Sequence, residues 1–208
     1  MRILFIDTSR EDVSIVIIND NKIEFKLNEN TLGKHSANTL VFIEKAFKET
    51  NLNKTDIDKI LIATGPGSFT GIRVGLTISK MYGYIEDIPL IPVSSLKMIA
   101  LSTKGDKILS IIGAKNDNYY IGVYDKEYND IIEEHFTSKE EILEIINNNI
   151  GITLVSDKAE VIEDFLFKKV EFDFEAIASY YKNKESINPH AINSNYLKLT
   201  SAEENLQK

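Results

Sequence analysis

Apolar residues recur along the chain with two periods, and the change from one period to the other predicts where strands give way to helices. Three strand-like runs come first, at residues 2–8, 13–19 and 22–27, with turn-forming residues between them. The first two runs are nearly continuously apolar, and the third alternates. This pattern predicts an antiparallel meander with two strands covered on both faces and a third strand at an edge.

A helix, a strand and a second helix are predicted next, and a glycine-rich loop joins the last two. Helical spacing covers residues 36–50, a short buried strand covers 60–63, and helical spacing resumes over 71–85. The loop between strand and helix contains Gly65, Pro66, Gly67, Ser68, Phe69, Thr70 and Gly71. Its glycines and proline predict a tight turn. A strand over 89–93 and a helix over 94–102 follow.

The second half of the chain repeats this order of elements without repeating the sequence. After Lys104 the pattern restarts with three strands, a helix, a strand and two helices, at residues 107–112, 118–124, 130–136, 139–147, 152–155, 159–167 and 174–181. A meander followed by a helix, twice over, predicts a two-lobed α/β protein. We therefore expect an N-terminal lobe at residues 1–104 and a shorter C-terminal lobe at 105–208.

Composition and charge narrow the classes of function. The chain has 208 residues and a formal net charge of −8, which argues against a surface that grips nucleic acid over most of its area. It has no cysteine, so disulfides, thiolate metal sites and cysteine nucleophiles are excluded. No apolar run reaches the roughly 18 residues of a membrane-spanning helix. Because residues 1–2 lead directly into a strand rather than a signal peptide, we expect a cytoplasmic protein.

The glycine-rich loop raises the hypothesis of a phosphate site, because glycines let a backbone approach a ligand and the N–H groups at a helix start favour an anion. The loop lacks the Lys-Ser or Lys-Thr of a Walker A motif and misses the Gly-x-Gly-x-x-Gly spacing by one position. The alternative is structural. In it the glycines permit a tight turn and close packing, and Ser68 and Thr70 cap the following helix.

The helix predicted over 71–85 carries apolar residues on two opposite faces. Val74, Ile78, Met81 and Ile85 share one face. The opposite face is lined by small and apolar residues, namely Ile72, Gly75, Leu76, Ser79 and Gly83. One face suffices for a core, and small residues let another helix approach closely, so the second face predicts a partner-binding helix. The alternative is that this face packs against the helix predicted over 36–50 in the same chain.

The helix predicted over 36–50 has an apolar arc wider than one core face needs. The core stripe consists of Leu40, Ile43 and Phe47. The arc is widened on one flank by Phe42 and Ala46 and on the other by Ala37 and Val41. If the two helices are adjacent, they form a helical pair that would complete a four-helix bundle with a second protein. Arg73, near the start of the second helix, is a candidate polar contact in that pairing.

Three segments of the chain resemble the bacterial family called TsaB or YeaZ. They are MRILFIDTS, which ends in Asp7, Thr8 and Ser9; Lys34-His35-Ser36; and above all GPGSFTGIRVGL. The resemblance implies the two-lobed fold of the actin-like ATPase and sugar-kinase superfamily. It also implies a non-catalytic dimerisation subunit of the complex that makes threonylcarbamoyladenosine beside the anticodon of tRNA.

The partners that the resemblance implies are a catalytic actin-like paralogue of the TsaD type and a small ATPase of the TsaE type. It further implies a homodimer when the chain is alone, with tRNA reached only indirectly and no membrane contact. We expect no metal, since His35 is a single histidine without converging ligands. We expect no catalytic residue or cofactor either, since the sequence shows no histidine metal pair, no Walker lysine and no nucleophile–base set. At the start of the second lobe the family has Asp-Ala-Arg, whereas this chain has Gly113-Ala114-Lys115.

Two alternative functions remain open on the sequence. The first is an active small-molecule kinase or ATPase of the same superfamily, in which Asp7 would lie near a metal and a small hydroxyl residue near the phosphates. The alternative is a structural role, in which Asp7 accepts hydrogen bonds from the N–H groups of the first turn. The second alternative is a metallopeptidase, a label attached to the catalytic relatives.

Overall fold

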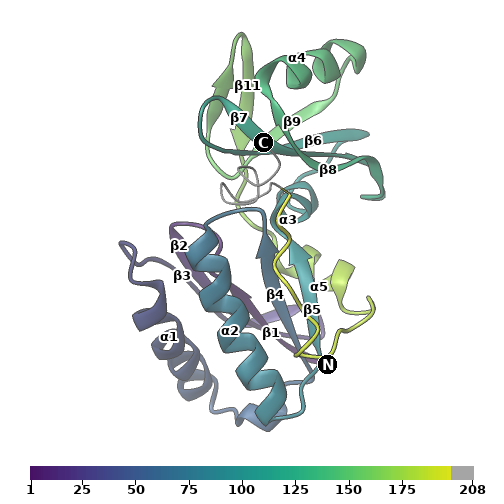
Figure 1. Ribbon diagram of the computed structural model, residues 1–208. Helices are drawn as coiled ribbons and strands as arrows, with labels where there is room; N and C mark the ends of the chain where they lie inside the picture. Colours follow the sequence, from purple (N-terminus) through teal and green to yellow (C-terminus); the bar gives the residue numbers. More distant parts are fainter. Residues whose placement is uncertain (198–208) are drawn as a thin grey trace. The chain divides into compact units, whose positions relative to one another are not determined.

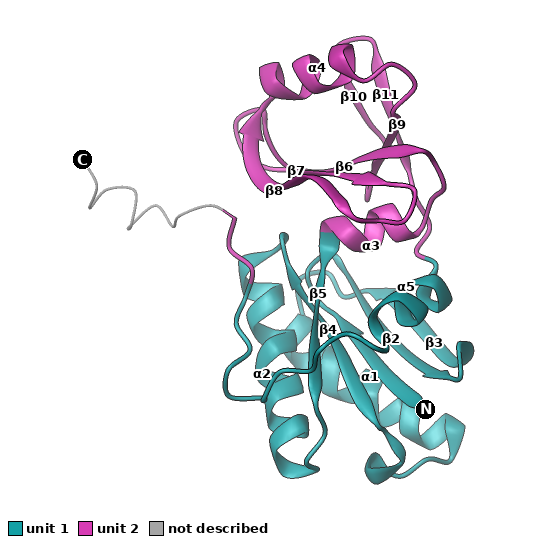
Figure 2. Ribbon diagram, turned by 90° about the vertical axis from the view of Figure 1, so that its right-hand side faces the viewer, with its two compact units in different colours: residues 1–95, 173–194 teal, residues 96–172, 195–208 magenta. Residues whose placement is uncertain are grey.

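The structure is a computed structural model, and it describes residues 1–197 of the 208. The chain forms two compact units (Figure 2). Unit 1 contains Met1–Ser95 and Asp173–Ser194, and unit 2 contains Leu96–Phe172 with the described residues from Asn195 onward. Over residues 1–197, no helix is long and apolar enough to cross a membrane.

Unit 1 is built on a five-stranded sheet in the order β3-β2-β1-β4-β5 (Figure 1). Its strands are β1 (Arg2–Asp7), β2 (Asp12–Asn19), β3 (Lys22–Asn30), β4 (Lys59–Gly65) and β5 (Leu90–Ser94). The first three pair antiparallel, and β4 and β5 run parallel to β1. The predicted meander is therefore present, with the alternating strand β3 at the edge.

Helices cover both faces of this sheet. Two long helices, α1 (His35–Thr50) and α2 (Phe69–Ile85), lie side by side on one face, and α5 (Phe174–Tyr181) packs on the other (Figure 1). Because side chains alternate along a strand, Leu4 and Ile6 of β1 join the core beneath α1 and α2. Phe5 points the opposite way, and its ring lies 5.2 Å from that of Phe174. A short 3-10 helix, Lys54–Asp56, precedes β4.

Unit 2 is built on a six-stranded sheet in the order β10-β11-β9-β6-β7-β8. Its strands are β6 (Lys107–Gly113), β7 (Asn118–Asp125), β8 (Asp130–Ser138), β9 (Thr153–Ser156), β10 (Glu160–Ile162) and β11 (Phe165–Lys169). The central strand β6 alternates between two cores. Leu109 and Ile111 pack with α4 (Lys139–Asn148), and Ile108 and Ile112 pack with α3 (Ser95–Leu101).

The two sheets share one order of connection. A meander of three antiparallel strands is followed by a strand parallel to its first member, as β3-β2-β1-β4 in unit 1 and β8-β7-β6-β9 in unit 2. The two α/β units with an internal repeat that the sequence predicts are confirmed.

One predicted element is wrong. The segment 159–167 is not a helix but the antiparallel hairpin of β10 and β11, with Glu163 in its turn at a φ of 51°. Ile162 and Phe167 are buried in the core. Val161 and Leu166 are opposite each other in the hairpin, and both are exposed. Apolar pairs spaced three or four residues apart fit a helix and a tight hairpin equally well, so the period alone did not separate them.

The division of the chain also differs from the single boundary expected near residue 104. Unit 1 ends its first stretch at Ser95, and the segment Asp173–Ser194 returns to it. This return places Phe174 against the sheet and sets Ile187 beside the edge strand β5, where its amide donates to the Leu90 carbonyl at 2.7 Å. An otherwise open sheet edge is thereby partly covered.

Candidate partner-binding surface and the glycine loop

The turn between β1 and β2 is held together by its own acidic residue. Asp7 is fully buried, and one of its carboxylate oxygens accepts hydrogen bonds from the Ser9 amide at 2.8 Å and the Ser9 hydroxyl at 2.7 Å. The other oxygen accepts from Nε of Arg10 at 3.0 Å. This is the geometry of a turn-forming aspartate, and it agrees with the structural role considered for Asp7 from the sequence.

The glycine-rich loop docks directly onto this turn. The Ser68 amide donates to the Ser9 carbonyl at 2.7 Å, and the Thr8 hydroxyl donates to the Gly71 carbonyl at 2.7 Å. A Cβ atom added to Gly67 would lie 2.4 Å from the Ser9 carbonyl oxygen, and one added to Gly71 would lie 2.0 Å from that of Thr8. Glycine is required here because two backbone segments of the same chain touch.

The entry into α2 is shaped by the rest of the loop. Gly65 ends β4 with a φ of +108°, a conformation that L side chains rarely adopt, and it is followed by Pro66. The Ser68 hydroxyl then accepts a hydrogen bond from the Gly71 amide at 3.2 Å and caps the helix. These contacts match the structural alternative for the loop. Thr70 is exposed on the first turn of α2.

His35 fastens the start of α1 to the same turn. Its Nε2 lies 2.7 Å from the Arg10 carbonyl oxygen, and its Nδ1 lies 3.3 Å from the Thr31 hydroxyl. Both ring nitrogens are therefore within hydrogen-bond distance of groups of the same unit. Within residues 1–197, no three His, Asp or Glu side chains gather in a way that could hold a metal ion.

The small-residue face of α2 lies against the sheet of its own unit, which corrects the sequence-based assignment of this face to a partner. Its members, Ile72, Gly75, Leu76, Ser79 and Gly83, are all buried. A Cβ on Gly75 would lie 2.4 Å from the Thr8 hydroxyl, and one on Gly83 would lie 2.3 Å from Leu90. The small residues let the helix approach strands rather than a second helix.

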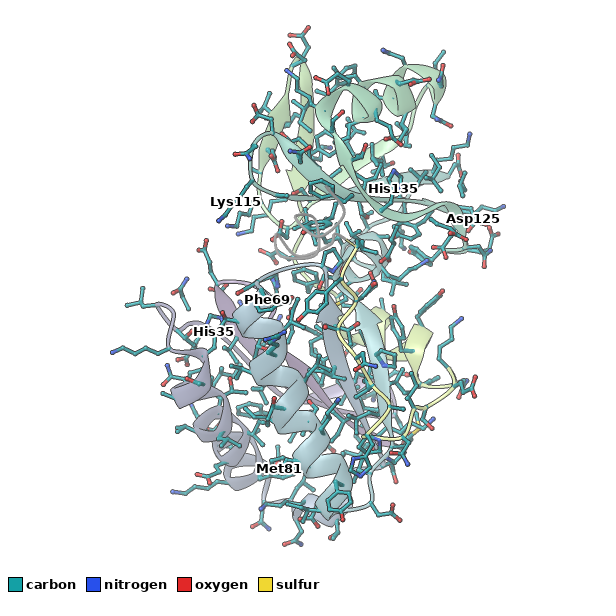
Figure 3. The ribbon with its side chains drawn as sticks, in the orientation of Figure 1. His35, Phe69, Met81, Lys115, Asp125 and His135 are labelled. Carbon is teal, nitrogen blue, oxygen red and sulfur yellow. The ribbon has the colours of Figure 1, made fainter. Side chains whose placement is uncertain are left out.

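The outward side of the helical pair carries large apolar side chains that are exposed. Leu40 and Val41 on α1 are 37% and 56% exposed. On α2 the large exposed apolar side chains are Phe69, Met81, Tyr84 and Ile85, two of which are labelled in Figure 3. We call these six residues the α1–α2 surface. Ala37 and Arg73, both predicted to bind a partner, are also exposed on these helices.

Periodicity did not identify which face of α2 is outward. Met81 and Ile85 were assigned to the core face and Leu40 to a core stripe, yet all three are exposed. Both faces of α2 are apolar, so a hydrophobic period fits either orientation. The glycines were the informative signal, because a buried helix face that touches backbone needs glycine, whereas the outer face tolerates Phe69 and Tyr84.

A groove of about 450 Å³ lies between the first turns of α1 and α2. Its apolar wall is formed by Leu40, Phe69, Val74 and Ile78. Arg73 also lines it, with its guanidinium carbon 3.9 Å from the centroid of the Phe69 ring. The groove is thus an apolar depression with a cation at its rim.

In unit 2, the Gly113-Ala114-Lys115 segment follows β6 and faces a carboxylate. A Cβ on Gly113 would lie 3.4 Å from Oε2 of Glu160. Burial raises the pKa of the Glu160 carboxyl; a hydrogen bond from Tyr119 opposes this rise in pKa, and the nearby Asp157 adds to it. This end of the strand therefore presents a partly buried acid.

The sequence of the chain is similar to those of known proteins. A family model described as "TsaD: tRNA N6-adenosine threonylcarbamoyltransferase" matches residues 29–198. The tRNA threonylcarbamoyladenosine biosynthesis protein TsaB of Bacillus subtilis is 28% identical, over 98% of this chain and 96% of the relative. The TsaB protein of Buchnera aphidicola subsp. Acyrthosiphon pisum is 31% identical, over 77% of this chain and 76% of the relative.

The solved structure of YeaZ from Pseudomonas aeruginosa has the same fold. It superposes with a TM-score of 0.75, covering 94% of this chain and 99% of that one, at 17% sequence identity. A second structure from the same organism, described as similar to peptidase YEAZ, gives a TM-score of 0.76 at the same identity.

The close contact at Gly71 predicts a loss of stability on Gly71→Ala. In an unhindered helix this change is stabilising by roughly 1 kcal/mol, but here the new methyl group would meet the Thr8 carbonyl. We expect the free energy of unfolding in urea to fall by about 1–3 kcal/mol. Thr77→Ala, at an exposed position of the same helix, is the control and should change it by less than about 0.5 kcal/mol. A Gly71→Ala protein as stable as the native one would contradict the contact.

The raised pKa of Glu160 predicts a pH-dependent effect of Glu160→Gln. A carboxyl with a folded-state pKa above its usual 4.5 contributes stability that is present below that value and lost as pH rises through the folded-state pKa. Glutamine removes the cost of ionising the buried group, so the variant should unfold at a higher temperature than the native chain at about pH 7. The difference should close near pH 4. An equal difference at both pH values would show that ionisation of Glu160 is not its cause.

Proposed function

The chain belongs to the TsaB/YeaZ family, and on that premise we propose that it is a non-catalytic subunit in the synthesis of threonylcarbamoyladenosine on tRNA. Its task would be to pair with a catalytic paralogue of the TsaD type, which transfers the threonylcarbamoyl group to the adenosine beside the anticodon. The relatives are named as proteins of tRNA threonylcarbamoyladenosine biosynthesis. The match to a transferase family model supports descent from a common ancestor with that paralogue.

The polar residues of the family motifs support a structural rather than a chemical role. Asp7, Thr8 and Ser9 are buried and bonded to neighbouring parts of unit 1. His35 contacts the Arg10 carbonyl and the Thr31 hydroxyl. A nucleophile or general base must instead reach a substrate atom at hydrogen-bond distance. The contacts of these four residues hold α1 and α2 in place, and that is the role we assign to them.

The single observation that carries the proposal is the α1–α2 surface. Two adjacent helices present Val41, Met81, Tyr84 and other large apolar side chains to solvent, and such patches mark protein interaction sites. A second helical pair laid across them would form a four-helix bundle and bury the patch. A paralogue with the same fold would present such a pair. When the chain is alone, a second copy would occupy the surface as a homodimer.

The remaining partners follow from the same pathway. We propose that a small ATPase of the TsaE type joins the pair and that tRNA is bound through the partners, because this chain has a net charge of −8. A cytoplasmic location fits that substrate.

We predict that Met81→Asp disrupts pairing with the paralogue. A charge placed in the middle of an apolar interface should weaken binding at least about thirtyfold, or roughly 2 kcal/mol, in a calorimetric titration against the purified TsaD-type paralogue of the same organism. Val161→Asp is the matched control, because Val161 is 65% exposed in unit 2 and lies outside the surface.

Circular dichroism of both variants checks that they fold. If Met81→Asp is folded and binds the paralogue as tightly as Val161→Asp does, then α2 does not mediate the pairing and the proposed function loses its structural basis.

A further inference from the structure

A second depression lies at the other end of the helical pair from the groove, and we call it the acidic depression. It has a volume of about 530 Å³. Its lining comes from the second half of α1, the C-terminal end of α2 and the segment between α1 and β4, all within unit 1. Two carboxylates, those of Glu44 and Glu86, line it together with the apolar side chains of Phe47 and Leu52.

The backbone makes this end of the two helices negative as well. α1 ends at Thr50 and α2 at Ile85, and the last carbonyl groups of a helix carry a partial negative charge. Glu86 is the C-cap of α2, whose last turn contains no basic residue. Within residues 1–197, neither Glu44 nor Glu86 takes part in an ion pair. A bound cation would therefore remove an unfavourable electrostatic interaction.

Tyr82 adds a buried hydroxyl to the same depression. The residue lines it and is only 6% exposed. Burial raises the pKa of the Tyr82 phenol, and the charges of Glu44 and Glu86 raise this pKa further, so both carboxylates act on the hydroxyl. In the part of the chain that the structure describes, this hydroxyl has no hydrogen-bond partner. Because buried polar groups are ordinarily hydrogen-bonded, the Tyr82 oxygen is available to a donor from a bound molecule.

The chain itself places a cation over the Tyr82 ring. Nζ of Lys54 lies 5.4 Å from the ring centroid, within the range of a cation–π contact. The ring of Phe47 is stacked with that of Tyr82, with 6.4 Å between the centroids. Lys54 is exposed, so its side chain can give way to a competing cation. With one ammonium group beside two carboxylates, the depression retains a net negative charge.

We propose that the acidic depression binds an organic cation, namely a guanidinium or primary ammonium group on a short alkyl stem. The N–H donors of the cation pair with Glu44 and Glu86, and the Tyr82 hydroxyl accepts a further hydrogen bond. The stem packs on Phe47 and Leu52. Among residues 1–197, no third His, Asp or Glu joins the two carboxylates to complete a metal site. The site goes beyond the proposed function and does not depend on it, because it lies within unit 1 of the isolated chain.

The test titrates the full chain with n-butylguanidinium chloride at constant ionic strength and follows the amide signals of unit 1 by NMR. n-Butylurea is the control probe, because it has the same stem and no charge. We expect saturable binding of n-butylguanidinium with a Kd on the order of 1 mM. n-Butylurea should bind at least about tenfold more weakly, since hydrogen bonds between charged groups are the stronger ones.

Five variants locate the site. Glu44→Gln and Glu86→Gln should each weaken binding of n-butylguanidinium about 3- to 10-fold, and Tyr82→Phe, which keeps the ring, about threefold. Lys54→Met should tighten it about threefold, because the resident ammonium group no longer competes. A merely structural role of Lys54 would not produce that gain. Glu49→Gln, which removes an acid of α1 outside the depression, is the control and should bind within about twofold of the native chain. Circular dichroism checks that all five fold.

Three results would overturn the proposal. Equal binding of n-butylurea would show an apolar depression only. Unchanged binding in both Glu44→Gln and Glu86→Gln would place the probe elsewhere on the chain. Displacement of the probe by Mg²⁺ at a concentration of about 1 mM would show a site for metal ions instead.

Pairing of the same variants with the TsaD-type paralogue identifies the source of the cation. If Glu44→Gln and Glu86→Gln weaken both probe binding and pairing while Glu49→Gln weakens neither, the cation is an arginine or lysine side chain of the paralogue. If they weaken probe binding alone, the cation is a free small molecule. The site stands in both cases. Normal pairing of Met81→Asp would overturn the proposed function and leave this site intact.

Discussion

The docking of the β1–β2 turn onto the glycine-rich loop is the contact on which the arrangement of unit 1 depends. Two hydrogen bonds join them, from the Ser68 amide to the Ser9 carbonyl and from the Thr8 hydroxyl to the Gly71 carbonyl. The same turn holds the start of α1 through His35, and the Ser9 hydroxyl lies 3.2 Å from that of Ser95. One short turn therefore positions the beginnings of α1 and α2. Because the backbones touch at Gly71, no larger residue fits there without displacing α2.

This constraint explains how residues typical of a ligand site serve assembly in our account. A glycine-rich loop before a helix, an aspartate at the end of the first strand and a histidine at a helix start are all familiar from nucleotide and metal sites. Here each has a partner within unit 1. The result is a helix whose small residues press onto the sheet and whose bulky residues face outward. The outward face is the surface that we assign to a partner.

Much of the fold could be predicted from the sequence, because period and turn residues carry most of the information about single elements. The meanders and the long helices were identified in this way, whereas the family was identified from the resemblance of three sequence segments. The solved YeaZ structure has the same fold. The hairpin at Glu160–Lys169 was missed because its apolar pairs also fit a helix. The outward face of α2 was missed because both of its faces are apolar. Only the contacts of Gly75 and Gly83 with the sheet decide between the faces, and those contacts depend on strands distant in sequence.

The central claim is that the bulky face of α2, not its small-residue face, meets the partner. It is tested most directly by the labelling rate of a single introduced cysteine, since the chain has no other. Tyr84→Cys on the α1–α2 surface and Leu166→Cys in unit 2 would be reacted with a bulky maleimide, with and without the TsaD-type paralogue. The account predicts that the paralogue slows labelling at position 84 at least about tenfold and leaves position 166 unchanged. Equal labelling at position 84 in the presence of bound paralogue would contradict it.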